Sequence, residues 1–150
     1  MDIIYKQGDL LECQEKWIVH GCNAQGVMGS GVAKAIKEKY PSAFRAYRAA
    51  EEVRGLTLGD LSWAEQVDGK IVFNAITQEF YGRAGKCYVD YNAIRWMVEG
   101  LNHLASEWGV VGVHVAMPKI GAGLGGGDWN YIEIIIEECS HNFQPVVYTL

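Results

Sequence analysis

Two glycine-rich segments have the composition of ligand-binding loops. The first runs from Asn23 to Gly31 (NAQGVMGSG) and the second covers residues 121–127 (GAGLGGG). Each lies between a strand pattern and a helical pattern. Glycines let backbone N–H groups approach a ligand closely, and a helix N-terminus adds partial positive charge. Two such loops at the carboxyl ends of strands can hold two adjacent phosphates. The alternative is that these glycines only make tight turns.

Other phosphate-binding motifs do not fit these loops. Gly121, Gly123 and Gly126 have the spacing of the dinucleotide-binding motif. They lie so near the C-terminus that the ribose-binding acid and the second half of that fold have no room. No Gly-Lys-Ser/Thr follows either loop, which argues against a nucleotide triphosphatase.

The composition disfavours several further functions. The chain has 150 residues and a formal net charge of −5 without a basic cluster, so nucleic acid is not an expected partner. The four cysteines form no CxxC pair, and no His stands at metal-ligand spacing from them, so we expect no metal and no cofactor. No apolar stretch is long enough for a membrane span, and no signal-peptide pattern begins the chain. We therefore expect a cytoplasmic monomer without membrane contact.

The elements that position the two loops follow from the apolar periodicity. Asp68 and Gly69 predict the turn of a hairpin, and Ser42 and Asp90 are expected to cap helices. Strand patterns cover residues 2–6, 17–22, 61–65, 71–76, 110–117 and 146–150. Helical patterns cover residues 32–40, 42–54, 91–108 and 129–139. This alternation predicts an α/β domain over residues 1–150, with a mixed sheet and helices on both faces.

Four motifs in this order resemble the macro domain family, whose members bind ADP-ribose. They are Gly8-Asp9-Leu10, Asn23 followed by 29–33 (GSGVA), 118–124 (PKIGAGL) and the closing 147–150 (VYTL). The resemblance covers nearly the whole chain. With 20–23 (HGCN) and 123–129 (GLGGGDW), it is strongest to the branch of the yeast-type ADP-ribose 1''-phosphate phosphatases and their phage and bacterial relatives. It implies a three-layer α/β/α fold with a central mixed six-stranded sheet.

The resemblance also implies binding roles. Asp9 would accept a hydrogen bond from the adenine amino group, Leu10 would place the base, and Tyr148 would stack on it. Asn23 would hold the distal ribose. The phosphates would lie on the two loops, at Gly29, Ser30, Gly31, Val32, Gly121, Ala122, Gly123, Leu124 and Gly125. Each residue also has a structural alternative: a turn carboxylate for Asp9, an amide tying down its own loop for Asn23, and a core tyrosine for Tyr148.

Two positions depart from related enzymes that strip ADP-ribose from macromolecules. Gln78, which we expect among the ligand-binding residues, stands where those enzymes use a lysine, and Gly125 stands where one of them uses an aspartate. This argues against a lysine-dependent covalent mechanism. The polar loop from Gln78 to Tyr88, with Tyr81, Arg83 and Lys86, could fold over the distal ribose or be a solvated connection.

The expected function is hydrolysis of ADP-ribose 1''-phosphate to ADP-ribose and phosphate. Asn23, His20 and Asp128 are the candidate catalytic residues, His20 as acid or base and Asp128 as a group that orients water. The structural alternatives are a buried histidine for His20 and a helix cap for Asp128. The alternative function is a non-catalytic module that binds ADP-ribose. A weaker alternative is a hydrolase that removes ADP-ribose from protein or nucleic acid.

Overall fold

A six-stranded sheet forms the centre of the computed structural model, which describes residues 1–82 and 86–150. The strand order is β1-β6-β5-β2-β4-β3. The strands are β1 (Ile4–Gln7), β2 (Trp17–Asn23), β3 (Leu61–Glu65), β4 (Ile71–Gln78), β5 (Val113–Met117) and β6 (Phe143–Thr149). The helices are α1 (Gly31–Lys39), α2 (Pro41–Arg54), α3 (Tyr91–Glu107) and α4 (Trp129–Cys139), with a short 3-10 helix at Leu10–Glu12.

The sheet is mixed, as the sequence predicted. All neighbouring strands run parallel except β3, which pairs antiparallel with β4 through the predicted hairpin at 68–69. Because β2, β4 and β5 are parallel neighbours, their carboxyl ends meet at one edge of the sheet. The segments that follow these three strands therefore leave from that same edge.

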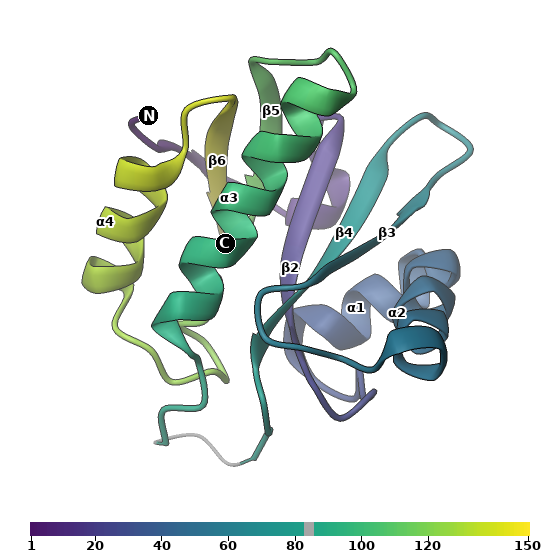
Figure 1. The fold of residues 1–150 in the computed structure, drawn as a ribbon. Helices are drawn as coiled ribbons and strands as arrows, with labels where there is room; N and C mark the ends of the chain where they lie inside the picture. The colour runs from purple at the N-terminus through teal and green to yellow at the C-terminus, as the bar shows by residue number, and fades with distance from the viewer. Residues whose placement is uncertain (83–85) are drawn as a thin grey trace.

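Helices cover both faces of the sheet, so the predicted three-layer fold is confirmed. In Figure 1, α3 and α4 lie in front of the sheet and α1 and α2 lie behind it. Residues along β2 alternate between the two cores: Trp17 and Val19 pack on the α3–α4 side, and Ile18 packs on the α1–α2 side. This period of two is what a strand buried on both faces requires.

Capping side chains and a proline determine where three of the helices begin. Asp90 caps α3 through an N–H from Ala93 at 3.0 Å, and Asp128 caps α4 through an N–H from Asn130 at 3.0 Å. The prediction for Ser42 is wrong, because α2 already begins at Pro41. Proline suits a first helical position, since the N–H that it lacks would have no helical partner there.

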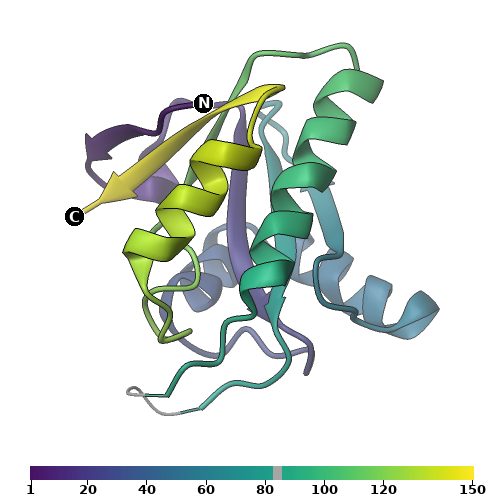
Figure 2. The same cartoon turned by 60° about the vertical axis from the view of Figure 1, so that its left-hand side comes forward.

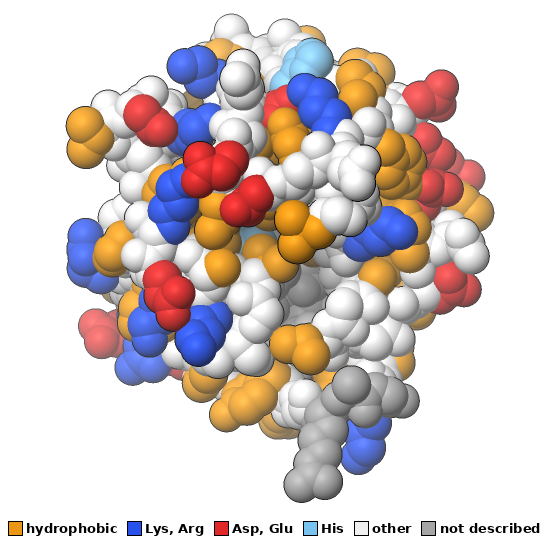
Figure 3. Space-filling model, turned by 180° about the vertical axis from the view of Figure 1, so that it is seen from behind, with side chains coloured by type: hydrophobic (Ala, Val, Ile, Leu, Met, Phe, Trp, Pro, Cys, Tyr) orange, Lys and Arg blue, Asp and Glu red, His pale blue; other side chains and the backbone are white. Residues whose placement is uncertain are grey.

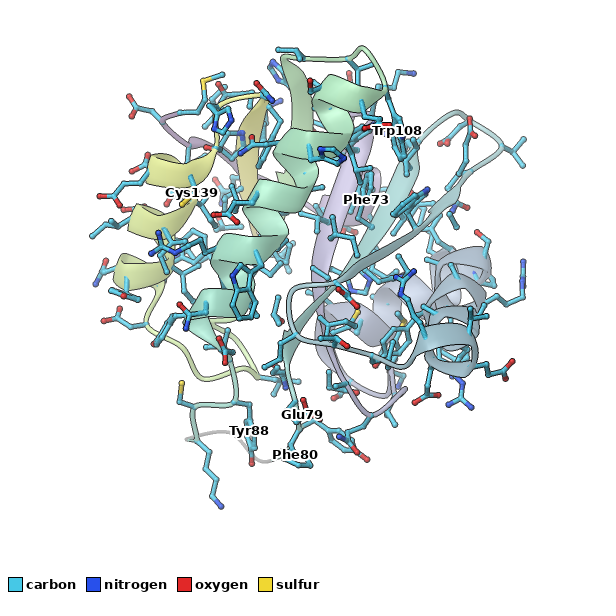
Figure 4. All side chains as sticks on the ribbon, viewed as in Figure 1. Phe73, Glu79, Phe80, Tyr88, Trp108 and Cys139 are labelled. Carbon is cyan, nitrogen blue, oxygen red and sulfur yellow. The ribbon has the colours of Figure 1, made fainter. Side chains whose placement is uncertain are left out.

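Aromatic packing stabilises the end of the sheet opposite the glycine loops. The rings of Phe73 on β4 and Trp108 after α3 stack with centroids 6.2 Å apart, and Figure 4 shows them side by side. Trp17 packs against Phe73 at 4.8 Å. Figure 2 shows that β1 and β6, near the two termini, run together along one edge. No helix of the described residues is long and apolar enough to cross a membrane.

Candidate functional site

Both glycine-rich loops line one pocket at the carboxyl edge of the sheet. Its volume is about 600 Å³. The segment after β2 contributes Val27 and residues 29–33, and the segment after β5 contributes residues 118–125. The first segment leads to α1 behind the sheet and the second to α4 in front. A crevice between two such neighbouring strands is where open α/β sheets bind ligands.

The two loops touch each other at the pocket. Gly31 has a φ of 61°, and a Cβ built on it would lie 3.1 Å from Cδ1 of Leu124. A glycine is favoured here because its backbone is left-handed and its Cα faces a side chain of the opposite loop. In the view from behind, the surface is hollowed near its centre, and hydrophobic side chains and white atoms border the hollow, with most charged side chains farther out (Figure 3).

Backbone N–H groups are the main polar feature of these loops. Within the described residues, the N–H groups of Gly29, Ser30 and Gly31 have no hydrogen-bond acceptor. The same is true of the N–H groups of Gly123 and Leu124 in the second loop. Ser30 is also the N-cap residue of α1. Unpaired N–H groups and a helix N-terminus together form an anion-binding surface.

Asn23 and Gln78 place two amide side chains at the end of the pocket beside β4. A register shift after Cys22 pairs Asn23 with Gln78 across the β2–β4 ladder. The Asn23 side chain is tied to its own loop: Oδ1 accepts the N–H of Gln25 at 2.9 Å, and Nδ2 donates to the carbonyl of Val27 at 2.8 Å. Gln78 donates to the carbonyl of Phe80 at 2.7 Å.

Few ionisable side chains line the pocket. Among its described lining residues there is no Asp, Glu or His, and the ionisable ones are Cys22, Tyr81 and Lys119. Cys22 is buried, and burial raises the pKa of its thiol, so it stays protonated near neutral pH. The described lining residues therefore suit anion binding through uncharged groups and include few side chains that could transfer a proton.

His20 lies in the core instead of the pocket. Its ring is fully buried and contacts the side chain of Asn74, with Nε2 2.7 Å from Oδ1. Asn74 in turn donates to the carbonyl of Ala43 in α2. Burial lowers the pKa of His20 to about 4, so the ring is neutral. This position argues against the acid–base role expected from the sequence, because the ring cannot reach a ligand.

Four other predicted site residues are not among those that line the pocket. Asp9 accepts the N–H of Leu11 at 2.9 Å and so caps the short 3-10 helix, while Leu10 is buried in the α1–α2 core. Asp128 caps α4 and is exposed. Tyr148 packs at the edge of the α1–α2 core, and its hydroxyl donates to Glu15 at 2.5 Å. These contacts match the structural alternatives for Asp9, Asp128 and Tyr148.

The structure adds two polar lining residues that the sequence did not single out, Thr77 and Lys119. Tyr81, which the sequence named as part of a polar loop that could cover the distal ribose, also lines the pocket. Lys119 lies two residues before the second glycine loop, and Thr77 is the penultimate residue of β4. Lys86 of the polar loop does not line the pocket, and Arg83 lies outside the described residues.

Fold and site together define an α/β domain with a pocket between two glycine-rich loops at the carboxyl edge of its sheet. The Macro domain family model matches residues 19–136, and the chain belongs to the macro domain family. The macrodomain of DarG from Thermus aquaticus superposes with a TM-score of 0.82 at 25% identity, covering 99% of this chain and 98% of that one.

Curated relatives with different names are similar to this chain. A DNA ADP-ribosyl glycohydrolase of Mycobacterium tuberculosis is 33% identical over 87% of this chain. This match spans only 36% of the relative's length. A 17.5 kDa protein of phage T4 is 32% identical over 98% of this chain and 96% of its own length. An ADP-ribose 1''-phosphate phosphatase of Neosartorya fischeri is 48% identical over 44 residues, which are 29% of this chain and 22% of that protein.

Proposed function

We propose that this chain binds ADP-ribose and holds its diphosphate on the backbone amides of the two glycine loops. The observation that carries this proposal is the meeting of both loops, with unpaired N–H groups, on one pocket that no carboxylate lines among its described residues. A pocket of about 600 Å³ is within the usual range for a ligand of this size. The names of the curated relatives agree, since both enzymes act on ADP-ribosyl compounds.

Calorimetry with ADP-ribose, AMP and NAD tests this proposal. We expect ADP-ribose to bind at least about tenfold more tightly than AMP, which lacks the second phosphate and the distal ribose. Gly31→Ala should weaken binding by about tenfold or more, because its Cβ would enter the contact with Leu124 and strain the loop. Gly55→Ala is a matched control: its φ is 77°, it follows α2, and it does not line the pocket.

Two results would contradict the proposal. Equal affinity for AMP and ADP-ribose would mean that the second phosphate and distal ribose add nothing. Equal weakening by Gly31→Ala and Gly55→Ala would mean that backbone strain in general, and not the loop at the pocket, controls binding.

Hydrolysis of ADP-ribose 1''-phosphate is the second candidate function, favoured by the local match to the phosphatase. Water would attack phosphorus, the bond between phosphorus and the ribose oxygen would break, and a proton would pass to that oxygen. The loop amides can stabilise the developing negative charge. Since no Asp, Glu or His is among the described lining residues, we expect slow phosphate release, reduced by Asn23→Ala. Release no faster than in a no-protein blank would leave binding alone.

Removal of ADP-ribose from DNA is the remaining alternative, favoured by the match over most of the chain to the glycohydrolase. Gln78 argues against it, because an amide cannot replace a lysine amine as a nucleophile. We therefore expect no release of ADP-ribose from an ADP-ribosylated oligonucleotide. Release by the wild type that Gln78→Ala abolishes would reverse this ranking.

A further inference from the structure

The hydroxyl group of Tyr47 lies at the centre of the first glycine loop. Tyr47 is a fully buried residue of α2. Its hydroxyl accepts the N–H of Gly26 at 3.1 Å. The same hydroxyl donates to Asn23, where both the main-chain oxygen and the side-chain Oδ1 are within bonding distance, the latter at 2.9 Å. One side chain from a helix thus connects both ends of the turn that follows β2.

Asn23 depends on these contacts for its orientation. Its Oδ1 receives the Tyr47 hydroxyl and the N–H of Gln25, and its Nδ2 donates to Val27. Every contact fixes the rotation of the amide plane and the path of residues 23–27 together. The amide uses one Nδ2 hydrogen in this way and retains the other, and it lines the pocket.

A neighbouring residue of α2 supports the same turn from its outer side. Nη1 of Arg48 donates to the carbonyl of Gly26 at 3.1 Å. Arg48 is about half exposed and also pairs with Glu51 at 3.5 Å. The turn at 23–27 is therefore attached to α2 by a buried contact and by a surface contact, while Gly31 and Val32 belong to α1 and are held by that helix.

We propose that Tyr47 is a positioning residue for ligand binding: its hydroxyl fixes Asn23 in the orientation that contacts the distal ribose of ADP-ribose. This rests on the proposed function. A group that is held in its bound orientation before the ligand arrives loses less conformational freedom on binding. Without the hydroxyl, the Gly26 N–H and the Asn23 carbonyl lose a buried partner, and the turn relaxes toward other conformations.

Comparison of ADP-ribose with ADP separates positioning from general stabilisation. ADP has both phosphates and lacks the distal ribose. We expect Tyr47→Phe to weaken ADP-ribose binding by about tenfold while ADP binding changes by less than about twofold. Tyr40→Phe is the matched control, since Tyr40 is a buried tyrosine whose hydroxyl has no hydrogen bond within the described residues and does not line the pocket.

A double-mutant cycle tests whether Tyr47 acts through Asn23. If it does, Tyr47→Phe in an Asn23→Ala background should change ADP-ribose affinity by less than about twofold. An unchanged tenfold effect in that background would overturn the proposed route. Equal weakening of ADP and ADP-ribose by Tyr47→Phe would also overturn the proposal, because it would indicate loss of the whole loop.

Amide hydrogen exchange without ligand separates this proposal from the proposed function. The Gly26 N–H bonds to the Tyr47 hydroxyl, so its exchange should be at least about tenfold faster in Tyr47→Phe and unchanged in Tyr40→Phe. Unchanged exchange at Gly26 would overturn the proposal whether or not ADP-ribose binds. Failure of the wild type to bind ADP-ribose would instead overturn the proposed function and, with it, the role of Tyr47 in ligand binding.

Arg48→Met gives a second variant if Tyr47→Phe does not fold. It removes the contact of Arg48 to the same turn and leaves the buried contacts of the Tyr47 hydroxyl in place. We expect about threefold weaker ADP-ribose binding with ADP unaffected. No change in either ligand, together with unchanged exchange at Gly26, would mean that attachment of the turn to α2 does not control the site.

Discussion

Single side chains in this domain acquire their roles from partners that are distant in the sequence. His20 precedes the first glycine loop by a few residues, which makes it a reasonable candidate for chemistry at the pocket. Its partner Asn74 lies on the neighbouring strand, 54 residues away. The buried, neutral ring of His20 contributes to packing and to the hydrogen bond with Asn74. The residues next to His20 in the sequence do not indicate this burial.

The buried ring of His20 should make folding stability depend on pH. Its pKa is about 4 in the folded protein and about 6.5 in an unfolded chain, so between these values the unfolded state binds the extra proton. This contribution to stability is present above about pH 6.5 and is lost as the pH falls toward 4. The expected loss from His20 is about 2 kcal/mol between about pH 7 and pH 5, measured by urea unfolding.

Two histidine variants isolate this effect. His20→Gln keeps a donor for Asn74 but cannot titrate, so its stability should change less than that of the wild type over the same pH interval. His103→Gln is the control, because the His103 side chain is exposed. An equal pH dependence in wild type and His20→Gln would contradict the assignment of a neutral, buried ring.

At the scale of elements, the second glycine loop is fastened to the segment that leads into α3. The carbonyl of Gly125 accepts the N–H groups of Tyr88 and Val89 at 2.7 and 3.1 Å. A Cβ on Gly125 would lie 2.7 Å from the carbonyl oxygen of Gly121, closer than real Cβ contacts. Close packing of the loop on itself therefore favours glycine at position 125. An aspartate at this position would require a different backbone path for the loop.

Alanine at two positions of this loop should therefore have different effects. We expect Gly125→Ala to lower the free energy of unfolding by about 1–3 kcal/mol, because its methyl group would push against backbone. Gly123→Ala should change it by less than about 0.5 kcal/mol, since nothing lies within 4 Å of its Cβ position. Urea unfolding of both variants measures the difference. Equal stability of the two would mean that the loop adjusts freely at Gly125.

The sequence predicted the elements better than the contacts between them. The aspartates that cap α3 and α4 lie immediately before their helices, and capping acts over two or three residues, so a local pattern contains it. Ser42 fails as a cap because the preceding proline already starts α2. The hydroxyl of Tyr47 belongs to a residue whose spacing in α2 indicates only burial. Its partners Asn23 and Gly26 precede it by more than 20 residues.

At the scale of the whole molecule, the strand order creates the pocket. The sequence predicted a mixed sheet, but it did not predict that β5 would lie beside β2 or that β1 would pair with β6. These pairings depend on how all six strands pack together with the helices on the two faces of the sheet. They bring together two loops that are separated by about ninety positions in the chain, which the resemblance to macro domains implied and periodicity could not.

The overall charge of the molecule predicts how the proposed binding of ADP-ribose should depend on salt. The chain has a net charge of −5, and Lys119 is the only Lys or Arg among the described residues that line the pocket. A site that holds phosphates with arginines or lysines loses affinity as salt screens the attraction. If the proposed site holds the phosphates through backbone dipoles, the attraction acts at short range, while the negative net charge repels the ligand at long range. We expect ADP-ribose affinity to stay within about threefold, or to rise, between about 20 and 300 mM NaCl.

Calorimetry of the wild type and of Lys119→Gln at both salt concentrations compares their ADP-ribose affinities and so tests which groups hold the phosphates. If backbone amides dominate, the two proteins should show the same small salt dependence. A fall of about tenfold in wild-type affinity, absent in Lys119→Gln, would assign the phosphates to the ammonium group of Lys119. The glycines of the second loop would then position a cation, and a single surface charge would decide how an acidic domain holds an anionic ligand.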